Sequence, residues 1–208
     1  MDLDVNAGGT LLLLQLAKKH GVKKFVHAST GSVYGEAQYF PQDEKHPLNP
    51  CSYYGVSKLA GERYVDMFDI DSCILRYFHV YGARQESNPD LGGVVAIFID
   101  KIRNGEPITI FGDGNQQRSF TYVKDVVKAN IEAVNQSGVH NCASGITVTI
   151  HELALKLYEL MGKKPDIIYA DWMEGDIKKF EIDNRKIKKY FGMEFMCDLE
   201  KGLKETIK

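Results

Sequence analysis

Cysteine is scarce in the 208-residue sequence, and no cysteine has the spacing of a metal ligand. A Cys/His zinc site needs clustered ligands, such as a Cys-x-x-Cys pair with a second pair nearby. The cysteines are instead scattered along the chain, at Cys51, Cys73, Cys142 and Cys197. We therefore expect no metal site, and free thiols in a reducing compartment are the simplest account of these residues.

Long apolar runs and a charge excess of one sign are also absent from the sequence. No segment reaches the roughly 18 apolar residues that a membrane span needs. The opening MDLDVNAGGTLLLL has acidic but no basic residues before its apolar run, which does not fit a signal peptide. The 26 Lys and Arg nearly balance the 28 Asp and Glu, which argues against a general nucleic-acid binder. We expect a soluble, cytoplasmic protein with neither a membrane nor a nucleic-acid partner.

The first half of the sequence contains an alternation of helix and strand patterns. Residues 9–19 and 52–68 have helical length and composition, whereas residues 23–29 and 72–80 are short apolar runs typical of buried strands. Strands separated by helices of this length indicate parallel βαβ units. The sequence therefore predicts an α/β fold with a Rossmann-like, doubly wound parallel sheet.

After residue 85 the pattern changes to shorter elements. Helices are expected at 92–105, 123–136, 149–162 and around 184–192, and strands at 106–112, 139–144 and 165–171. Thr149 and Glu152 have the spacing of a capping box at the start of a helix. We therefore divide the chain into residues 1–85 and a smaller α/β region, residues 86–208, with some elements of the second part returning to the first sheet.

A tyrosine and a lysine stand four residues apart in SYYGVSK, residues 52–58. Residues i and i+4 of a helix share one face, so Tyr54 and Lys58 are neighbours, whereas Tyr53 is one residue out of register. An ammonium near a phenol lowers the phenol's pKa, which would suit Tyr54 for acid–base chemistry. A surface Tyr–Lys contact is the alternative. Glu62, four residues further on, could form an exposed ion pair with Lys58.

Two polar stretches follow the predicted strands of the first half. STGSVYG, residues 29–35, comes at the end of one strand, and the residues after LRYF, residues 75–78, come at the end of the next. Ligands of open α/β sheets bind outside the carboxyl ends of the strands. Because the helix with Tyr54 begins near the same edge, we expect these segments to form one site.

Five motifs follow one another along the chain. They are N-x-x-G-T from Asn6, S-T-x-x-V-Y-G from Ser29, Y-x-x-x-K from Tyr54, L-R-Y-F-x-V-Y-G from Leu75 and R-x-F-x-Y-V-x-D from Arg118. In this order the chain resembles the extended short-chain dehydrogenase/reductase family, and within it the NAD-dependent nucleotide-sugar epimerases. The resemblance implies NAD as cofactor and a UDP-sugar as substrate. It also implies epimerisation at C4 of a UDP-hexose, UDP-glucose or UDP-galactose, through a 4-keto sugar.

The resemblance implies three catalytic residues. Tyr54 would be the general acid/base, Lys58 would bind the nicotinamide ribose, and Thr30 would hydrogen-bond the reacting sugar hydroxyl. The residues for which it implies cofactor contacts are Asn6, Ser29, Tyr54, Lys58 and Phe78. A turn residue ending a strand is the alternative for Thr30, and a helix N-cap is the alternative for Asn6.

Substrate contacts are implied at positions from both parts of the chain. These positions are Thr30, His79, Val94, Val95, Ile110, Phe111, Arg118 and Asp176. Arg118 is the candidate for the pyrophosphate, because a guanidinium can donate two hydrogen bonds to phosphate oxygens. A solvated surface charge is the alternative for Arg118, and a packing or hinge role is the alternative for His79.

The sequence also departs from the family pattern. It lacks the opening strand and the G-x-x-G-x-x-G turn that would receive the pyrophosphate of NAD, so we expect a fragment of a longer protein that binds NAD poorly by itself. Gly31-Ser32 stand where sugar-nucleotide dehydratases carry an Asp-Glu pair, which argues against dehydration. The alternative activities are UDP-glucuronate decarboxylation and epimerisation of a different nucleotide-sugar, and a non-catalytic nucleotide-binding member or inactive fragment is the alternative class. The resemblance implies a homodimer formed through the helices at 9–19 and 52–68.

Overall fold

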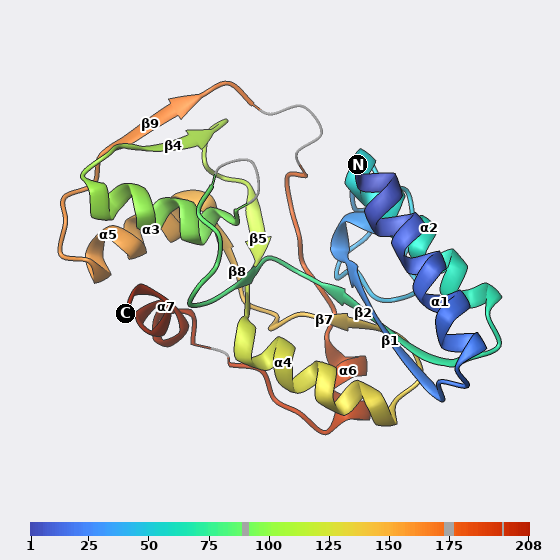
Figure 1. Ribbon diagram of the computed structural model, residues 1–208. Helices are drawn as coiled ribbons and strands as arrows, with labels where there is room; N and C mark the ends of the chain where they lie inside the picture. Colours follow the sequence, from blue (N-terminus) through green and yellow to red (C-terminus); the bar gives the residue numbers. More distant parts are fainter. Residues whose placement is uncertain (89–91, 173–176, 197) are drawn as a thin grey trace.

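The computed structural model describes residues 1–88, 92–172, 177–196 and 198–208. Three parallel strands form its first sheet in the order β1-β2-β7, with β1 at Lys24–Thr30, β2 at Asp71–Tyr77 and β7 at Gly138–Cys142. Four helices lie on its two faces, α1 (Gly9–Lys19) and α2 (Tyr53–Met67) on one, α4 (Val123–Glu132) and α6 (Arg185–Phe191) on the other (Figure 1). The predicted parallel α/β sheet with helices on both faces is therefore confirmed.

Strand β2 supplies apolar side chains to both faces of this sheet. Ile74 packs against Leu14 of α1 and Val65 of α2, whereas Cys73 and Leu75 lie in the cluster that includes α4 and α6. Successive strand residues point to opposite faces, so a strand covered on both sides reads as a continuous apolar run. The apolar run SCILRYF therefore predicted a buried strand, but it could not show which of its residues face which helix.

The second part of the chain has its own hydrophobic core. Strand β4 (Ile108–Phe111) pairs in parallel with β9 (Ile167–Ala170), and helices α3 (Val94–Asn104) and α5 (Ile150–Leu160) pack beside them. Phe98, Ile108, Leu153 and Leu157 are among the buried residues of this core. Two short ladders complete it: β5 (Gln117–Ser119) is antiparallel to β8 (Thr147–Thr149), and β3 (Val80–Tyr81) is parallel to β6 (Thr121–Tyr122).

The structure refines several sequence expectations. The capping box of Thr149 and Glu152 is confirmed, with both of its hydrogen bonds present. The strand expected at 72–80 is broken at Phe78-His79, where His79 has a φ of 33°. Strands β3, β5, β6 and β8 were not predicted, because ladders of two or three residues are too short to show a period. Helix α7 (Leu199–Ile207) was also missed, and its central Gly202 weakens the helical pattern.

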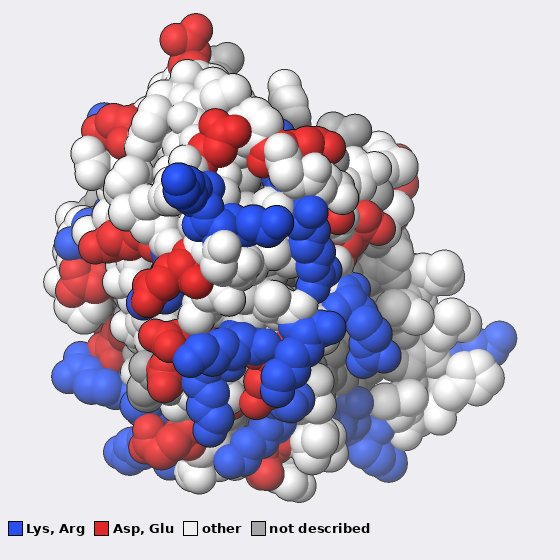
Figure 2. All heavy atoms as spheres, turned by 90° about the vertical axis from the view of Figure 1, so that its left-hand side faces the viewer, with Lys and Arg blue, Asp and Glu red and all other residues white. Residues whose placement is uncertain are grey.

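Charges of both signs share the face that is built by the second part of the chain. Lys and Arg side chains gather in its middle with Asp and Glu beside them (Figure 2). Glu200 of α7 accepts from Lys204 at 2.7 Å and lies 3.5 Å from Lys156 of α5. None of the helices in the described ranges has the length and apolar character that crossing a membrane requires.

His27 of β1 is buried, and its burial predicts loss of stability in acid. Its pKa is lowered from 6.5 to about 4, mainly by burial and then by Lys58, with Glu62 opposing. Between these two pH values the unfolded chain binds a proton that the folded chain does not, so stability falls as pH drops, by up to about 1.4 kcal/mol per pH unit for one group. Urea unfolding at pH 7 and pH 5 measures this slope. His27→Gln should reduce it, whereas the same change at exposed His20 should not; equal slopes in both variants would refute the assignment to His27.

Candidate active site

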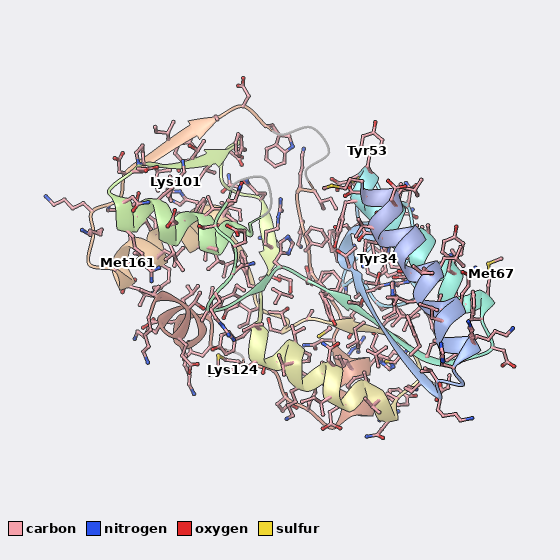
Figure 3. All side chains as sticks on the ribbon, viewed as in Figure 1. Tyr34, Tyr53, Met67, Lys101, Lys124 and Met161 are labelled. Atoms are coloured by element: carbon pink, nitrogen blue, oxygen red, sulfur yellow. The ribbon has the colours of Figure 1, made fainter. Side chains whose placement is uncertain are left out.

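Helix α2 begins at the carboxyl edge of the sheet and directs Tyr54 toward β1. Ser52 caps the helix, its side-chain oxygen accepting from Gly55 N at 3.1 Å. Tyr53 is 93% exposed and points away from the protein (Figure 3). Tyr54, in contrast, shares a side-chain hydrogen bond with Thr30 at the end of β1. The two side chains that sequence reasoning singled out from separate motifs therefore meet in the structure.

The small residues of SYYGVSK allow this approach. A Cβ at position 55 would lie only 2.7 Å from the carbonyl oxygen of Ser32, so the helix can contact the turn after Thr30 only with glycine there. Ser57 is buried and donates to the carbonyl oxygen of Tyr54 at 2.8 Å. Ser57 also accepts a hydrogen bond from Asn6 Nδ2 at 3.0 Å. Helix α2 thus packs closely on the turn after Thr30 and on the segment with Asn6, which explains why the small residues Gly55 and Ser57 stand between Tyr54 and Lys58.

Lys58 faces β1 and does not pair with Glu62. Its Nζ donates to the carbonyl oxygen of Ala28 at 2.5 Å. Glu62 is 2% exposed and binds Arg76 of β2 instead. The exposed Lys58–Glu62 pair suggested by the spacing is therefore wrong, because the carboxylate is drawn into the interior by a buried guanidinium.

The electrostatics of Tyr54 differ from the expectation. Burial raises the pKa of Tyr54 above its ordinary value, and the hydrogen bond with Thr30 offsets this only in part. Burial also lowers the pKa of Lys58, which Glu62 opposes. The predicted lowering of the Tyr54 pKa by Lys58 is thus wrong for this structure. The reason is that the ammonium is directed at the Ala28 carbonyl and the phenol is partly desolvated.

A pocket of about 140 Å³ is lined by Ser32 and Ser52, which stand two residues from Thr30 and Tyr54, and it brings together residues far apart in the chain. It is lined by Ser32, Cys51, Ser52, His79, Arg118, Ile177 and Phe180. Arg118 of β5 is only 6% exposed and donates to the carbonyl oxygen of Ile177 at 2.6 Å. The alternative of a solvated surface charge for Arg118 is therefore wrong. A buried guanidinium lining a pocket suits an anionic ligand.

His79 has both features that the sequence left open, packing and pocket lining. Its ring lies 5.1 Å from the ring of Phe180 and 5.8 Å from that of Phe120. Within the described residues its Nδ1 is buried without a hydrogen-bond partner. Burial and the charge of Arg118 lower its pKa to about 3, so the imidazole is neutral at pH 7. With its positive φ, it is a strained residue of the kind found at functional sites.

A larger hollow of about 530 Å³ opens next to β4 and β9. Its lining residues are Asp113, Asn115, Gln116, Trp172 and Lys178. Gln116 Nε2 donates to the carbonyl oxygen of Phe111 at 2.7 Å, which ties this wall to the predicted segment 108–112. Sequence reasoning named Ile110 and Phe111 of the adjoining strand, neither of which lines the hollow, and missed Gln116 and Trp172. The one signal that could have found Trp172 is that it is the only tryptophan of the chain and follows a predicted strand.

The remaining predicted residues lie in three different settings. Val95 and Ile110 are each 1% exposed within the core of the second part, and Val94 packs against that core. Ser29 and Phe78 are also buried. Asn6 lies inside the π-helical turn Leu3–Gly8 that precedes α1, so the helix N-cap alternative for it is wrong. Asp176 lies outside the described residues. Contacts of these residues with a ligand stay predictions.

The residues at the carboxyl edge of β1 fit the reactive end of a nicotinamide cofactor. Tyr54 is 43% exposed and Lys58 is partly buried, so both can be reached from outside. Among the described strands β1 is paired on one side only, which leaves its other edge open to further backbone. The hydroxyls of Thr30 and Tyr54, with Lys58 beside them at the end of β1, can hydrogen-bond a ribose and transfer a proton.

This parallel sheet, with Tyr54 and Lys58 on a helix and Thr30 at the end of the adjoining strand, is the architecture of the extended short-chain dehydrogenase/reductase class. The sequence model of the NAD dependent epimerase/dehydratase family matches residues 2–143. The chain belongs to this family.

Individual relatives agree with the assignment. A putative UDP-glucose 4-epimerase of Methanocaldococcus jannaschii is 39% identical over 212 residues, covering 99% of this chain and 69% of the relative. A UDP-glucose 4-epimerase of Thermotoga maritima, solved with UDP-glucose, superposes with a TM-score of 0.94 at 38% identity, over 99% of this chain and 69% of that one. The Thermus thermophilus UDP-glucose 4-epimerase, solved with NAD, gives a TM-score of 0.92 at 32% identity, over 98% and 69%. The chain thus spans about two thirds of the length of these relatives.

Proposed function

We propose that the protein carrying this chain is an NAD-dependent UDP-sugar 4-epimerase that interconverts UDP-glucose and UDP-galactose. The observation that carries the proposal is the contact of Tyr54 with Thr30 beside the pocket of His79 and Arg118. Ser32 and Ser52, each two residues from Thr30 or Tyr54, line that pocket. A sugar in the pocket would therefore lie next to an acid–base group, with its diphosphate near a guanidinium.

Each residue has a separate task in this mechanism. NAD would be held at the carboxyl edge of β1 with Lys58 at its ribose, and it would supply the hydride chemistry at C4 of the sugar. Tyr54 accepts the proton of the C4 hydroxyl and later gives it back, while Thr30 hydrogen-bonds the same oxygen and orients it. Burial raises the pKa of Tyr54, and the hydrogen bond with Thr30 opposes this rise, so Thr30 favours the phenolate form that accepts the proton. Between the two proton transfers the 4-keto sugar turns over in the pocket, so that the hydride returns to its other face.

The test is conversion of UDP-galactose by the purified natural full-length polypeptide supplied with NAD. We expect UDP-glucose to form, followed by chromatography, and NAD to be released on denaturation of the protein. Release of CO₂ from UDP-glucuronate without epimerisation would assign the decarboxylase activity instead. Absence of both reactions, with nucleotide still bound, would assign a non-catalytic binding role.

Replacing Arg118 should weaken substrate binding. A charge-assisted hydrogen bond contributes about 1.5–3 kcal/mol, so Arg118→Ala is expected to raise KM for the UDP-sugar by roughly 10- to 150-fold. Steady-state kinetics of this variant and of Arg63→Ala measure the difference, because Arg63 is on the exposed surface of α2. Equal KM values in the Arg118→Ala variant and the unaltered protein would show that Arg118 does not contact the diphosphate.

We further propose a homodimer that associates through α1 and α2 in the cytoplasm. Leu12, Leu13 and Val56 are each at least half exposed on these helices, and exposed apolar patches mark association surfaces. Light scattering of Leu13→Glu against the unaltered protein tests this surface.

In the proposed epimerase, residues 1–85 form the catalytic part of the NAD-binding domain. Residues 86–208 bind the nucleotide-sugar, with β7 and α6 returning to the first sheet.

A further inference from the structure

A row of buried polar side chains crosses the three-stranded sheet directly beneath the candidate active site. Ser29 of β1 is in register with Arg76 of β2, and Arg76 is in register with Asn141 of β7. Residues in one such row point to the same face of a sheet. All three are at most 3% exposed. A row of three buried polar side chains, one from each strand, needs a specific explanation.

Glu62 of α2 lies over this row and binds two of its members. Arg76 donates to both carboxylate oxygens, from Nε to Oε1 at 2.9 Å and from Nη2 to Oε2 at 2.6 Å. Ser29 Oγ donates to Oε1 at 2.5 Å. A planar guanidinium that meets a carboxylate with two parallel hydrogen bonds fixes direction as well as distance. The helix is therefore held at a defined position along β1 and β2.

Tyr34 extends the same network to the turn that follows Thr30. Arg76 Nη1 donates to Tyr34 Oη at 2.8 Å, and Tyr34 Oη donates to Asn141 Oδ1 at 2.6 Å. The Tyr34 side chain is fully buried, and its ring centroid lies 4.7 Å from the guanidinium carbon of Arg76. Thr30 thus lies between two anchored residues, Ser29 before it and Tyr34 after it.

The network and the candidate catalytic groups share the same two elements. Glu62 stands four residues after Lys58 and eight after Tyr54, so the three lie along one face of α2. Opposite them on β1 lie Ser29 against Glu62 and Ala28 against Lys58. A slide of α2 along β1 would break these contacts and separate Tyr54 from Thr30.

Stability alone does not account for the pair. A buried ion pair loses so much hydration that well-packed apolar replacements of similar size are often neutral or stabilising. A bidentate pair, however, tolerates only one register of helix on sheet. We propose that the buried Glu62–Arg76 pair is a positioning device that sets the register of α2 on β1, so that the hydroxyl of Tyr54 meets Thr30. The kinetic part of this inference rests on the proposed epimerase function.

The test replaces both charges at once in the natural full-length polypeptide. Glu62→Met with Arg76→Met is expected to leave the urea midpoint unchanged or raised, to leave KM for the UDP-sugar unchanged, and to lower kcat by roughly 10- to 100-fold through misplacement of Tyr54. Lys24→Gln with Asp71→Asn is the matched control. Those residues form a pair at the other end of β1 and β2, 2.9 Å apart, with Lys24 half-buried and Asp71 exposed, and their replacement should leave kcat unchanged. An unchanged kcat in the Met double variant would overturn the proposal.

Glu62→Gln keeps the inference testable if the double variant does not fold. It retains the shape but loses the charge, so kcat should fall less than in the double variant, at constant KM. A loss of stability with kcat unchanged would show that the pair is only structural.

A second readout does not depend on activity. NMR titration of ring-labelled tyrosine, with Tyr54→Phe to identify the signal, should show a higher pKa for Tyr54 in either variant, because the hydrogen bond with Thr30 lowers it. An unchanged titration of Tyr54 would refute positioning even if the unaltered protein converts no UDP-sugar. Failure of the epimerase proposal would appear instead as inactivity of the unaltered protein with the titration shifted in the variants.

Discussion

Tyr54→Phe is expected to lower kcat for UDP-galactose conversion by about 10²- to 10⁴-fold, the range that general acid–base catalysis contributes. The phenylalanine keeps the ring and its packing on α2 but removes the only group of that side chain that moves a proton. KM should change little, because Arg118 and the rest of the pocket stay intact. The measurement is steady-state conversion by the full-length polypeptide with saturating NAD.

The neighbouring tyrosine provides the control for this experiment. Tyr53 is 93% exposed at the tip of α2 and points away from the site (Figure 3), so Tyr53→Phe should leave kcat unchanged. A similar loss in both variants would indicate damage to the start of α2 and not removal of an acid–base group. Full activity of Tyr54→Phe would remove the basis of the proposed mechanism.

Gly55→Ala is expected to lower both stability and activity, although alanine is the better helix former. In an exposed helix the exchange of glycine for alanine stabilises by about 1 kcal/mol. At position 55 the new methyl group would lie 2.7 Å from the Ser32 carbonyl oxygen, and that backbone cannot move without shifting the turn after Thr30. Overpacking of this kind destabilises by about 1–3 kcal/mol. Displacement of Tyr54 from Thr30 should lower kcat by about 10²-fold.

Gly8→Ala is the matched control for that substitution. Gly8 is an exposed glycine of helical conformation, and an added Cβ would find its nearest neighbour at 3.8 Å, an ordinary contact. Urea unfolding should show a gain of about 0.5–1 kcal/mol for this variant. Stabilisation of Gly55→Ala by the same amount would show that α2 does not depend on close contact with the turn.

Local patterns predicted the elements of the first sheet because those patterns are properties of neighbouring residues. The apolar runs at 23–29 and 72–80 correspond to β1 and β2, and the helical segments at 9–19 and 52–68 correspond to α1 and α2. The spacing of Tyr54 and Lys58 likewise places both on the face of α2 that meets β1, and Tyr53 outside it. Strands of two or three residues, such as β5 and β8, are too short to show a sequence period, and only their pairing in the folded chain defines them.

Which of two possible partners a charged residue binds could not be predicted in this way. Glu62 of α2 has Lys58 four residues earlier and Arg76 on strand β2, and the sequence spacing favoured Lys58. In the structure the arginine binds it, because Arg76 is buried and lies in register with Ser29 under the helix. The choice depends on burial, which strengthens a paired charge and penalises an unpaired one.

The sequence by itself determined the α/β class, the family and the group of Thr30, Tyr54 and Lys58, because periodicity and short motifs record local geometry. The tertiary structure alone decided that His79 and Arg118 share a pocket, that Glu62 pairs with Arg76, and that the pKa of Tyr54 is raised. Each of these depends on desolvation and on contacts between segments far apart in the chain. Such effects arise only when the segments pack together.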